Sequence, residues 1–209
     1  MQETVKIEGG FAEVGAGAWL MGRGQPAAFF GSVVRRRRKG FFIRDRSALD
    51  LVETTASAKC ADARRPFLTH IPCAAPISAA SAKVLVAPAA ARTGAEVVKM
   101  IPMSLKGSLC VTVFGENWVV MATASRTARL QVADGDTLSV RPESIVAWTG
   151  NRPTGFCPKL GLWDILLPRG PRDLLLHFHG PAVVWVEGVH APNFPASKLS
   201  NVYRRSYGA

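Results

Sequence analysis

The densest group of chemically active side chains in this sequence is a short basic run. Residues 35–39 read Arg-Arg-Arg-Arg-Lys, and Arg44 and Arg46 follow after Phe41 and Phe42. A guanidinium group forms paired hydrogen bonds to phosphate, and an aromatic ring beside basic residues can stack on the bases of single-stranded RNA. The alternative is a solvated loop or hairpin tip, because neighbouring strand side chains point to opposite faces and four consecutive arginines cannot all cover a core.

The last residues of the chain, 188–209, are polar and rich in tyrosine and arginine. This composition is typical of a tail that lies on a surface or on a partner. The basic run and this tail together supply the predicted contacts to RNA or another anionic partner, which are Arg35, Arg36, Arg37, Arg38, Lys39, Arg44, Arg46, Arg204 and Arg205.

Histidine and cysteine are the residues with which this chain could hold a metal ion. His177 and His179 alternate in a predicted strand, so both rings lie on one face, but no third ligand follows at a useful spacing. His70 and Cys73 are three residues apart without a second pair. A structural zinc site needs four protein ligands. We therefore predict no metal site and no cofactor.

Catalytic motifs are missing from the sequence. There is no Gly-x-Ser-x-Gly, no His-Glu-x-x-His and no cluster of carboxylates. Asp134-Gly135-Asp136 could imitate a catalytic pair, but Asp and Gly are also what a tight connection between strands requires. We predict no catalytic residue and no small-molecule substrate, so the chain is expected not to be an enzyme.

The elements that carry these residues read as short antiparallel strands. Runs of β-branched and aromatic residues alternate with Gly, Asp, Asn and Pro, most clearly between residues 105 and 187. Residues 54–82 are instead dominated by Ala, Ser, Pro and basic residues. The expected organisation is a first β half over 1–53, an irregular insertion or linker over 54–82, a second β half over 83–187, and a tail over 188–209.

Four tryptophans fall within the strand patterns, and they favour a packed β core over a base-stacking platform. They are Trp118, Trp148, Trp163 and Trp185. Cysteines 60, 73, 110 and 157 are widely spaced, which favours reduced thiols.

Charge is the strongest bulk property of the chain. A net charge of +11 over 209 residues favours nucleic acid, anionic lipid or an acidic protein as the partner. Proteins of some compartments, mitochondria among them, are also basic without such a partner. No apolar run reaches the roughly 18 residues of a membrane-spanning helix, and the N-terminus resembles neither a signal peptide nor a transit peptide.

Three segments carry a resemblance to a known family. They are Ala-Lys-Val-Leu-Val-Ala-Pro at 82–88, Gly-Asp-Thr-Leu-Ser-Val-Arg-Pro with Ser-Ile-Val-Ala-Trp over 135–148, and Phe-His-Gly-Pro-Ala-Val-Val-Trp-Val at 178–186. In order and pattern they resemble the altered inheritance of mitochondria protein 24 family, also described as a mitochondrial biogenesis domain. Ala182 departs from the usual Gly, and neither the basic run nor residues 54–82 is a feature of that family.

The resemblance implies an all-β fold like that of the tryptophan RNA-binding attenuation protein, an antiparallel β-sandwich built by internal duplication. It also implies a non-enzymatic role, a mitochondrial location in the matrix or on the matrix face of the inner membrane, and no catalytic residues. Fold alone does not transfer function.

Together, these features predict a structural or assembly protein that docks through basic segments into a large mitochondrial ribonucleoprotein such as the mitochondrial ribosome. The expected partners are ribosomal RNA and neighbouring proteins. The alternative is an inner-membrane or cristae-organising protein that contacts anionic lipid or acidic protein partners.

Overall fold

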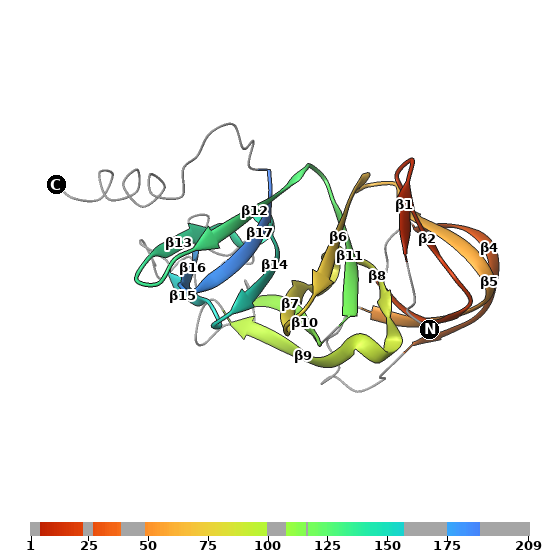
Figure 1. Cartoon of the computed structure of the whole chain (residues 1–209), viewed down its shortest axis with the longest axis horizontal. Helices are drawn as coiled ribbons and strands as arrows, with labels where there is room; N and C mark the ends of the chain where they lie inside the picture. Colours follow the sequence, from red (N-terminus) through yellow and green to blue (C-terminus); the bar gives the residue numbers. More distant parts are fainter. Residues whose placement is uncertain are drawn as a thin grey trace, which may run out of the picture.

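The described part of the protein is built of β-strands linked by short turns. The computed structural model describes residues 5–22, 27–38, 49–99, 108–115, 117–156 and 175–188, and Figure 1 shows their strands arranged side by side along the long axis of the molecule. This confirms the prediction of an all-β fold. Among these residues no helix is long and apolar enough to span a membrane.

The strands, in chain order, are β1 (Lys6–Glu8), β2 (Phe11–Val14), β3 (Gly17–Gly22), β4 (Ala27–Arg38), β5 (Leu49–Asp62), β6 (Phe67–Cys73), β7 (Ile77–Ala80), β8 (Val84–Pro88), β9 (Arg92–Lys99), β10 (Ser108–Phe114), β11 (Asn117–Thr123), β12 (Thr127–Val132), β13 (Thr137–Val140), β14 (Ile145–Gly150), β15 (Thr154–Phe156), β16 (Leu175–His179) and β17 (Ala182–Glu187). Single 3₁₀ turns, η1 (Ser81–Lys83), η2 (Ala89–Ala91) and η3 (Pro142–Ser144), precede β8, β9 and β14.

All the strand pairs of the described residues are antiparallel, and they form three sheets. The first has the order β1-β2-β5-β3-β8-β11-β6, with β4 paired to β5. The second has the order β12-β17-β14-β7-β10-β9, and the third is β13-β16-β15. Several sheet neighbours are far apart in the chain, so the fold depends on long-range pairing.

The same strand pattern recurs in tandem. In residues 67–123, here called module 2, β10 pairs β7 and β9, while β11 pairs β6 and β8. In residues 127–187, module 3, β16 pairs β13 and β15, while β17 pairs β12 and β14. The 3₁₀ turns η1 and η3 occupy the same place in the two modules. The described chain therefore repeats one unit of strands.

Residues 11–62, module 1, repeat this pattern with longer strands. The first half of β5 pairs β3, and its second half pairs β2. β4 pairs with β5 along its whole length, so β4 corresponds to two consecutive strands of module 2, β8 and β9. The described chain thus contains three copies of one unit rather than two.

Glycines confirm this alignment of the modules. Gly150 at the end of β14 has φ of +89°, and a Cβ there would lie 2.7 Å from the Pro181 carbonyl oxygen. Gly31 in β4 has φ of +131°, and a Cβ there would lie 2.7 Å from the Ser57 carbonyl oxygen. Both glycines lie opposite an alanine of the neighbouring strand, Ala182 and Ala58 respectively. Gly31 and Gly150 therefore occupy corresponding positions, where only glycine fits.

The modules are joined by one strand pair each. β8 of module 2 pairs β3 of module 1, and β14 of module 3 pairs β7 of module 2. The side chains of these strands are the centre of the core: Leu20, Val86, Ala79 and Ala147 are all at most 1% exposed.

Two of the predicted core tryptophans are buried as expected. Trp118 packs against Trp19 with the ring centres 5.7 Å apart, and Trp148 packs edge-on against Phe178 at 5.6 Å. Trp185 is only half-buried, and the Arg129 guanidinium lies over its ring, 5.9 Å from the centre. Trp163 lies outside the described residues.

The expectation of an irregular linker over 54–82 is wrong. These residues complete β5 and form β6, β7 and the first part of η1. The prolines misled the prediction: Pro72 lies in β6, which ends its sheet, and an edge strand tolerates proline because one side of its backbone needs no hydrogen-bonding partner. Pro76 immediately precedes β7.

We predict that Gly150→Ala lowers the free energy of unfolding by about 2–4 kcal/mol, because it combines an unfavourable φ with a steric clash against backbone. Gly135→Ala is the matched control, since Gly135 has φ of +80° but a Cβ added there would meet nothing within 4 Å. It should lose only about 1 kcal/mol. Urea unfolding of both variants measures the difference, and equal losses would contradict the close approach at Gly150.

Candidate functional site

The arginine run lies on a strand. Residues 35–38 end β4 and pair with β5, so the alternative of a solvated loop or hairpin tip is wrong for these four positions. Antiparallel pairing with a long neighbouring strand satisfies the backbone of β4, which a solvated loop would leave to water. Lys39, Arg44, Arg46, Arg204 and Arg205 lie outside the described residues.

The register of β4 on β5 leaves a positive excess at these positions. Arg35 lies opposite Glu53 and Arg38 opposite Asp50. Arg36 and Arg37 lie opposite Val52 and Leu51, which carry no charge. In this register, four basic residues lie opposite two acidic and two apolar ones.

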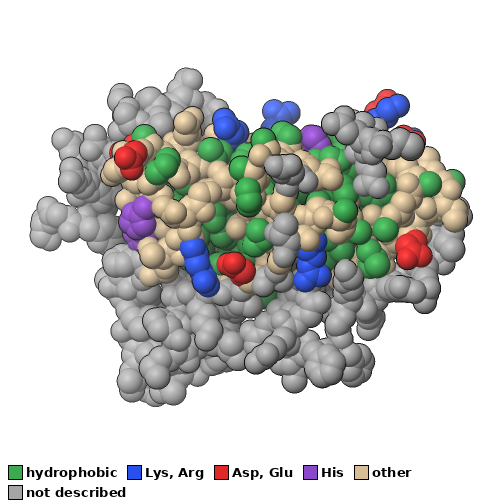
Figure 2. Space-filling view, turned by 60° about the horizontal axis from the view of Figure 1, so that its bottom comes forward, with side chains coloured by type: hydrophobic (Ala, Val, Ile, Leu, Met, Phe, Trp, Pro, Cys, Tyr) green, Lys and Arg blue, Asp and Glu red, His purple; other side chains and the backbone are tan. Residues whose placement is uncertain are grey.

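Other basic side chains are spread over the surface. Figure 2 shows them as separate spots on one face, with acidic side chains between them. The exposed basic residues of the described part are Lys6, Lys59, Arg64, Arg126, Arg129, Arg141 and Arg152. Lys59 belongs to module 1, Arg129, Arg141 and Arg152 belong to module 3, and the others lie beside the modules, so the run in β4 is the densest basic segment of the described chain.

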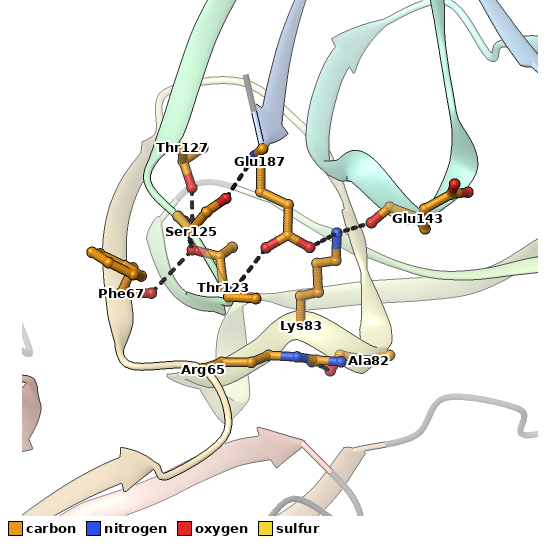
Figure 3. Close-up of polar contacts among 11 residues, drawn as sticks. Arg65, Phe67, Ala82, Lys83, Thr123, Ser125, Thr127, Glu143 and Glu187 are labelled. Carbon is orange, nitrogen blue, oxygen red and sulfur yellow. Dashed lines mark hydrogen bonds and ion pairs between the residues drawn. The ribbon is translucent and has the colours of Figure 1, made fainter. Parts of the chain in front are cut away.

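A buried ion pair joins modules 2 and 3 (Figure 3). The Lys83 ammonium lies 2.6 Å from Glu187 Oε1, with the two side chains only 9% and 15% exposed. It also donates to the Glu143 carbonyl oxygen of η3. Glu187 Oε2 accepts a hydrogen bond of 2.9 Å from the Ala124 backbone N–H. The pair therefore fixes η1, η3 and the end of β17 to one another.

Hydroxyl groups extend this polar network around the connection between the modules. The Gly188 N–H donates to Ser125 Oγ at 2.7 Å. The Thr123 hydroxyl lies 2.7 Å from the Ser125 carbonyl oxygen and 3.1 Å from that of Phe67. The Arg65 guanidinium donates to the Ala82 carbonyl oxygen next to Lys83. Sequence reasoning missed Lys83, although a single lysine directly before the apolar run 84–88 was a signal.

The charges of Lys83 and Glu187 hold modules 2 and 3 together. The pKa of Lys83 is lowered by burial, and the hydrogen bond and charge of Glu187 oppose only part of this effect. The ammonium donates to a carboxylate and a carbonyl oxygen, so its protons are committed to holding two modules together. A buried charge with both partners in place is stable, whereas removal of one partner is costly.

The two histidines on β16 are bonded to the neighbouring strand. His177 Nδ1 lies 3.1 Å from Ser139 Oγ, and His179 Nδ1 lies 3.1 Å from Thr137 Oγ1. Burial, and then the charge of His179, lower the pKa of His177. Both rings share one face as predicted. The described residues contain no cluster of three or more His, Cys, Asp or Glu that could hold a metal ion.

His70 and Cys73 do not form a site either. His70 is exposed and packs against Trp118, with ring centres 5.9 Å apart, whereas Cys73 is buried. Burial lowers the pKa of His70 and raises the pKa of Cys73 to about 11. Burial also raises the pKa of Cys60 to about 12, and its thiol donates to the Ala12 carbonyl oxygen at 3.3 Å. Both thiols are therefore protonated and unreactive at neutral pH.

Comparisons with known proteins bear on the fold alone. No family model matches the chain, and no curated protein matches it. Among solved structures, the crystal structure of protein SPYM3_0169 from Streptococcus pyogenes is similar, with a TM-score of 0.63 at 12% sequence identity. The match covers 98% of this chain and 99% of that one. The arrangement of strands therefore occurs in a second protein over its full length.

We predict that Lys83→Met lowers the free energy of unfolding by about 3 kcal/mol, because Glu187 then loses the cation that balances its buried charge. The double variant Lys83→Met/Glu187→Gln should recover most of that loss, since glutamine keeps an acceptor for the Ala124 N–H without a charge. Urea unfolding provides the measurement. A double variant as unstable as Lys83→Met would contradict this account of the pair.

We also predict a loss of stability at alkaline pH that depends on Cys60. The pKa of an unperturbed thiol is 9.0 and that of the native Cys60 is about 12, so the unfolded chain gives up its proton first. Stability is complete below pH 9 and falls as the pH rises towards 12, by up to about 1.4 kcal/mol per pH unit from this thiol. Cys60→Ala should show a shallower fall over this alkaline range in unfolding experiments. The lowered pKa of Lys83 acts in the opposite direction in both proteins and cancels in the comparison; identical slopes would contradict the prediction.

Proposed function

We propose that this chain is a non-enzymatic structural protein that docks through basic segments onto the RNA of a large mitochondrial ribonucleoprotein, such as the mitochondrial ribosome. The observation that carries the proposal is the arginine run of β4, opposite which the register places only two acidic residues, Glu53 and Asp50. Guanidinium groups on an extended strand suit a phosphate backbone, because both present charges at regular intervals.

Three further features support the proposal. The net charge of +11 favours a polyanionic partner. Among the described residues, the polar groups of Figure 3 bond to one another across a module boundary, as expected of a scaffold. The mitochondrial location rests on the family resemblance of residues 82–88, 135–148 and 178–186.

The proposal predicts salt-dependent RNA binding that requires the run in β4. Replacing Arg35, Arg36, Arg37 and Arg38 by glutamine should weaken binding to a fluorescent single-stranded RNA. It should also make the plot of log K against log salt concentration shallower, by up to about 3 if all four contact phosphates. Fluorescence anisotropy over a salt series measures both effects.

The matched control removes the same charge elsewhere. Lys6, Arg64, Arg126 and Arg141 are exposed and lie on other parts of the fold, so their glutamine variant should bind RNA more tightly than the β4 variant. Equal weakening by the two variants would reject a specific role for β4. Binding to vesicles containing cardiolipin but not to RNA would replace this proposal with the membrane-organising one.

A further inference from the structure

The two joints between modules in the described chain have the same strand pairing. β3 of module 1 pairs with β8 of module 2, and β7 of module 2 pairs with β14 of module 3. Each joint completes a six-strand sequence of the same order: β4-β5-β3-β8-β11-β6 in one sheet and β9-β10-β7-β14-β17-β12 in the other. At both joints, a strand of one module pairs with a strand of the next module.

The third joint is not made within the described chain. The counterpart of β3 and β7 in module 3 is β13, and its sheet stops after β13-β16-β15. The counterpart of β8 and β14 in module 1 is the first half of β4, residues 27–31, which the glycine match between Gly31 and Gly150 identifies. Among the described residues this half of β4 pairs only with β5. One half-sheet therefore ends at β13 and the complementary half-sheet ends at β4.

Side-chain exposure agrees with two incomplete edges. On β14, Ala147 and Trp148 are 0% and 2% exposed. Counting back from the matched glycines, their counterparts on β4 are Ala28, which is exposed, and Phe29, which is half-buried. The next residue of β4, Phe30, is 60% exposed and is the most exposed large hydrophobic residue of the described chain.

The β13 edge shows the same contrast. Ile77 of β7 is 1% exposed and pairs with Phe114, a core residue that is 0% exposed. Leu138 of β13 pairs with Phe178, which is also 0% exposed, so Leu138 corresponds to Ile77. Leu138 is only half-buried. The position that a neighbouring strand covers in module 2 is open in module 3.

The two open edges lie at opposite ends of the molecule. Figure 1 shows β13 at one end of the long axis and β4 at the other, with β7, β8 and β11 between them. They cannot pair with each other in this arrangement. An exposed strand edge with an apolar residue beside it is a template for strand addition from another chain.

We propose that a second copy of this chain completes the third sheet, with β13 of one copy pairing head to tail with residues 27–31 of the next. The register follows from the joint between β7 and β14, in which Ala147 lies opposite Ala79, Trp148 opposite Ser78 and Thr149 opposite Ile77. The corresponding pairs between copies are Ala28 with Val140, Phe29 with Ser139 and Phe30 with Leu138. Because the two edges differ, the contact is heterologous and generates a ring or an open filament rather than a twofold dimer.

Cysteine cross-linking tests this register directly. Phe30→Cys and Leu138→Cys are made in separate full-length proteins of different tag length, with Cys110 and Cys157 replaced by serine. Directly opposed residues of an antiparallel pair meet the distance requirement of a disulfide. Oxidation of the mixture should give a mixed disulfide between the two proteins. When either protein is instead mixed with the unsubstituted parent and oxidised, no mixed disulfide should form.

Sedimentation supplies the second measurement. The parent protein should sediment above the 22.4 kDa of one chain with a mass that rises with concentration, and Phe30→Lys should weaken self-association tenfold or more. Phe67→Lys is the matched control, because Phe67 is 41% exposed on β6, and it should leave association unchanged. A protein that stays at the mass of one chain at every concentration overturns the proposal. So does a Phe30→Cys/Leu138→Cys protein that forms its disulfide within one chain, since the two edges would then close on each other.

Discussion

The pairing of β3 with β8 and of β7 with β14 holds this protein together. Each module leaves one strand without a neighbour on one side, and a buried strand cannot leave its backbone groups unpaired. The next module supplies the missing partner. The joint lies in the centre of a sheet, and Val86, Ala79 and Ala147 are fully buried there. Folding of one module is thus tied to folding of the next.

The ion pair of Lys83 and Glu187 reinforces one of these joints with a directional interaction. Apolar packing holds two sheets together but does not fix their relative position. The Lys83 ammonium contacts both Glu187 and the Glu143 carbonyl oxygen, and it can do so in only one relative position of the modules. The cost is desolvation of two charges, which burial imposes on Lys83 through its lowered pKa. Such a pair is better suited to specifying the junction than to adding net stability.

The repeated module explains the two open strand edges of the described chain as well as its two joints. In a series of modules, each of which pairs one strand with the preceding module and one with the following module, the first and last modules each keep an unpaired strand edge unless these two edges pair with each other. In this structure the ends are β13 and the first half of β4, on opposite sides of the molecule. The arginines at 35–38 continue the same strand that carries the exposed Phe30, so the proposed RNA contact and the proposed joint between copies are neighbours on β4.

The sequence by itself determined that the chain is all-β, because alternation of apolar and polar residues is a local property with a period of two. It also determined the burial of Trp118 and Trp148 and the excess of positive charge. It did not reveal that residues 54–82 are strands, that residues 35–38 pair with β5, or that Lys83 meets Glu187 from a distant part of the chain. Those features depend on which strands pair, and pairing joins residues that local patterns cannot relate. Only the tertiary structure decides it, since each edge strand could in principle accept several partners and the global packing selects one.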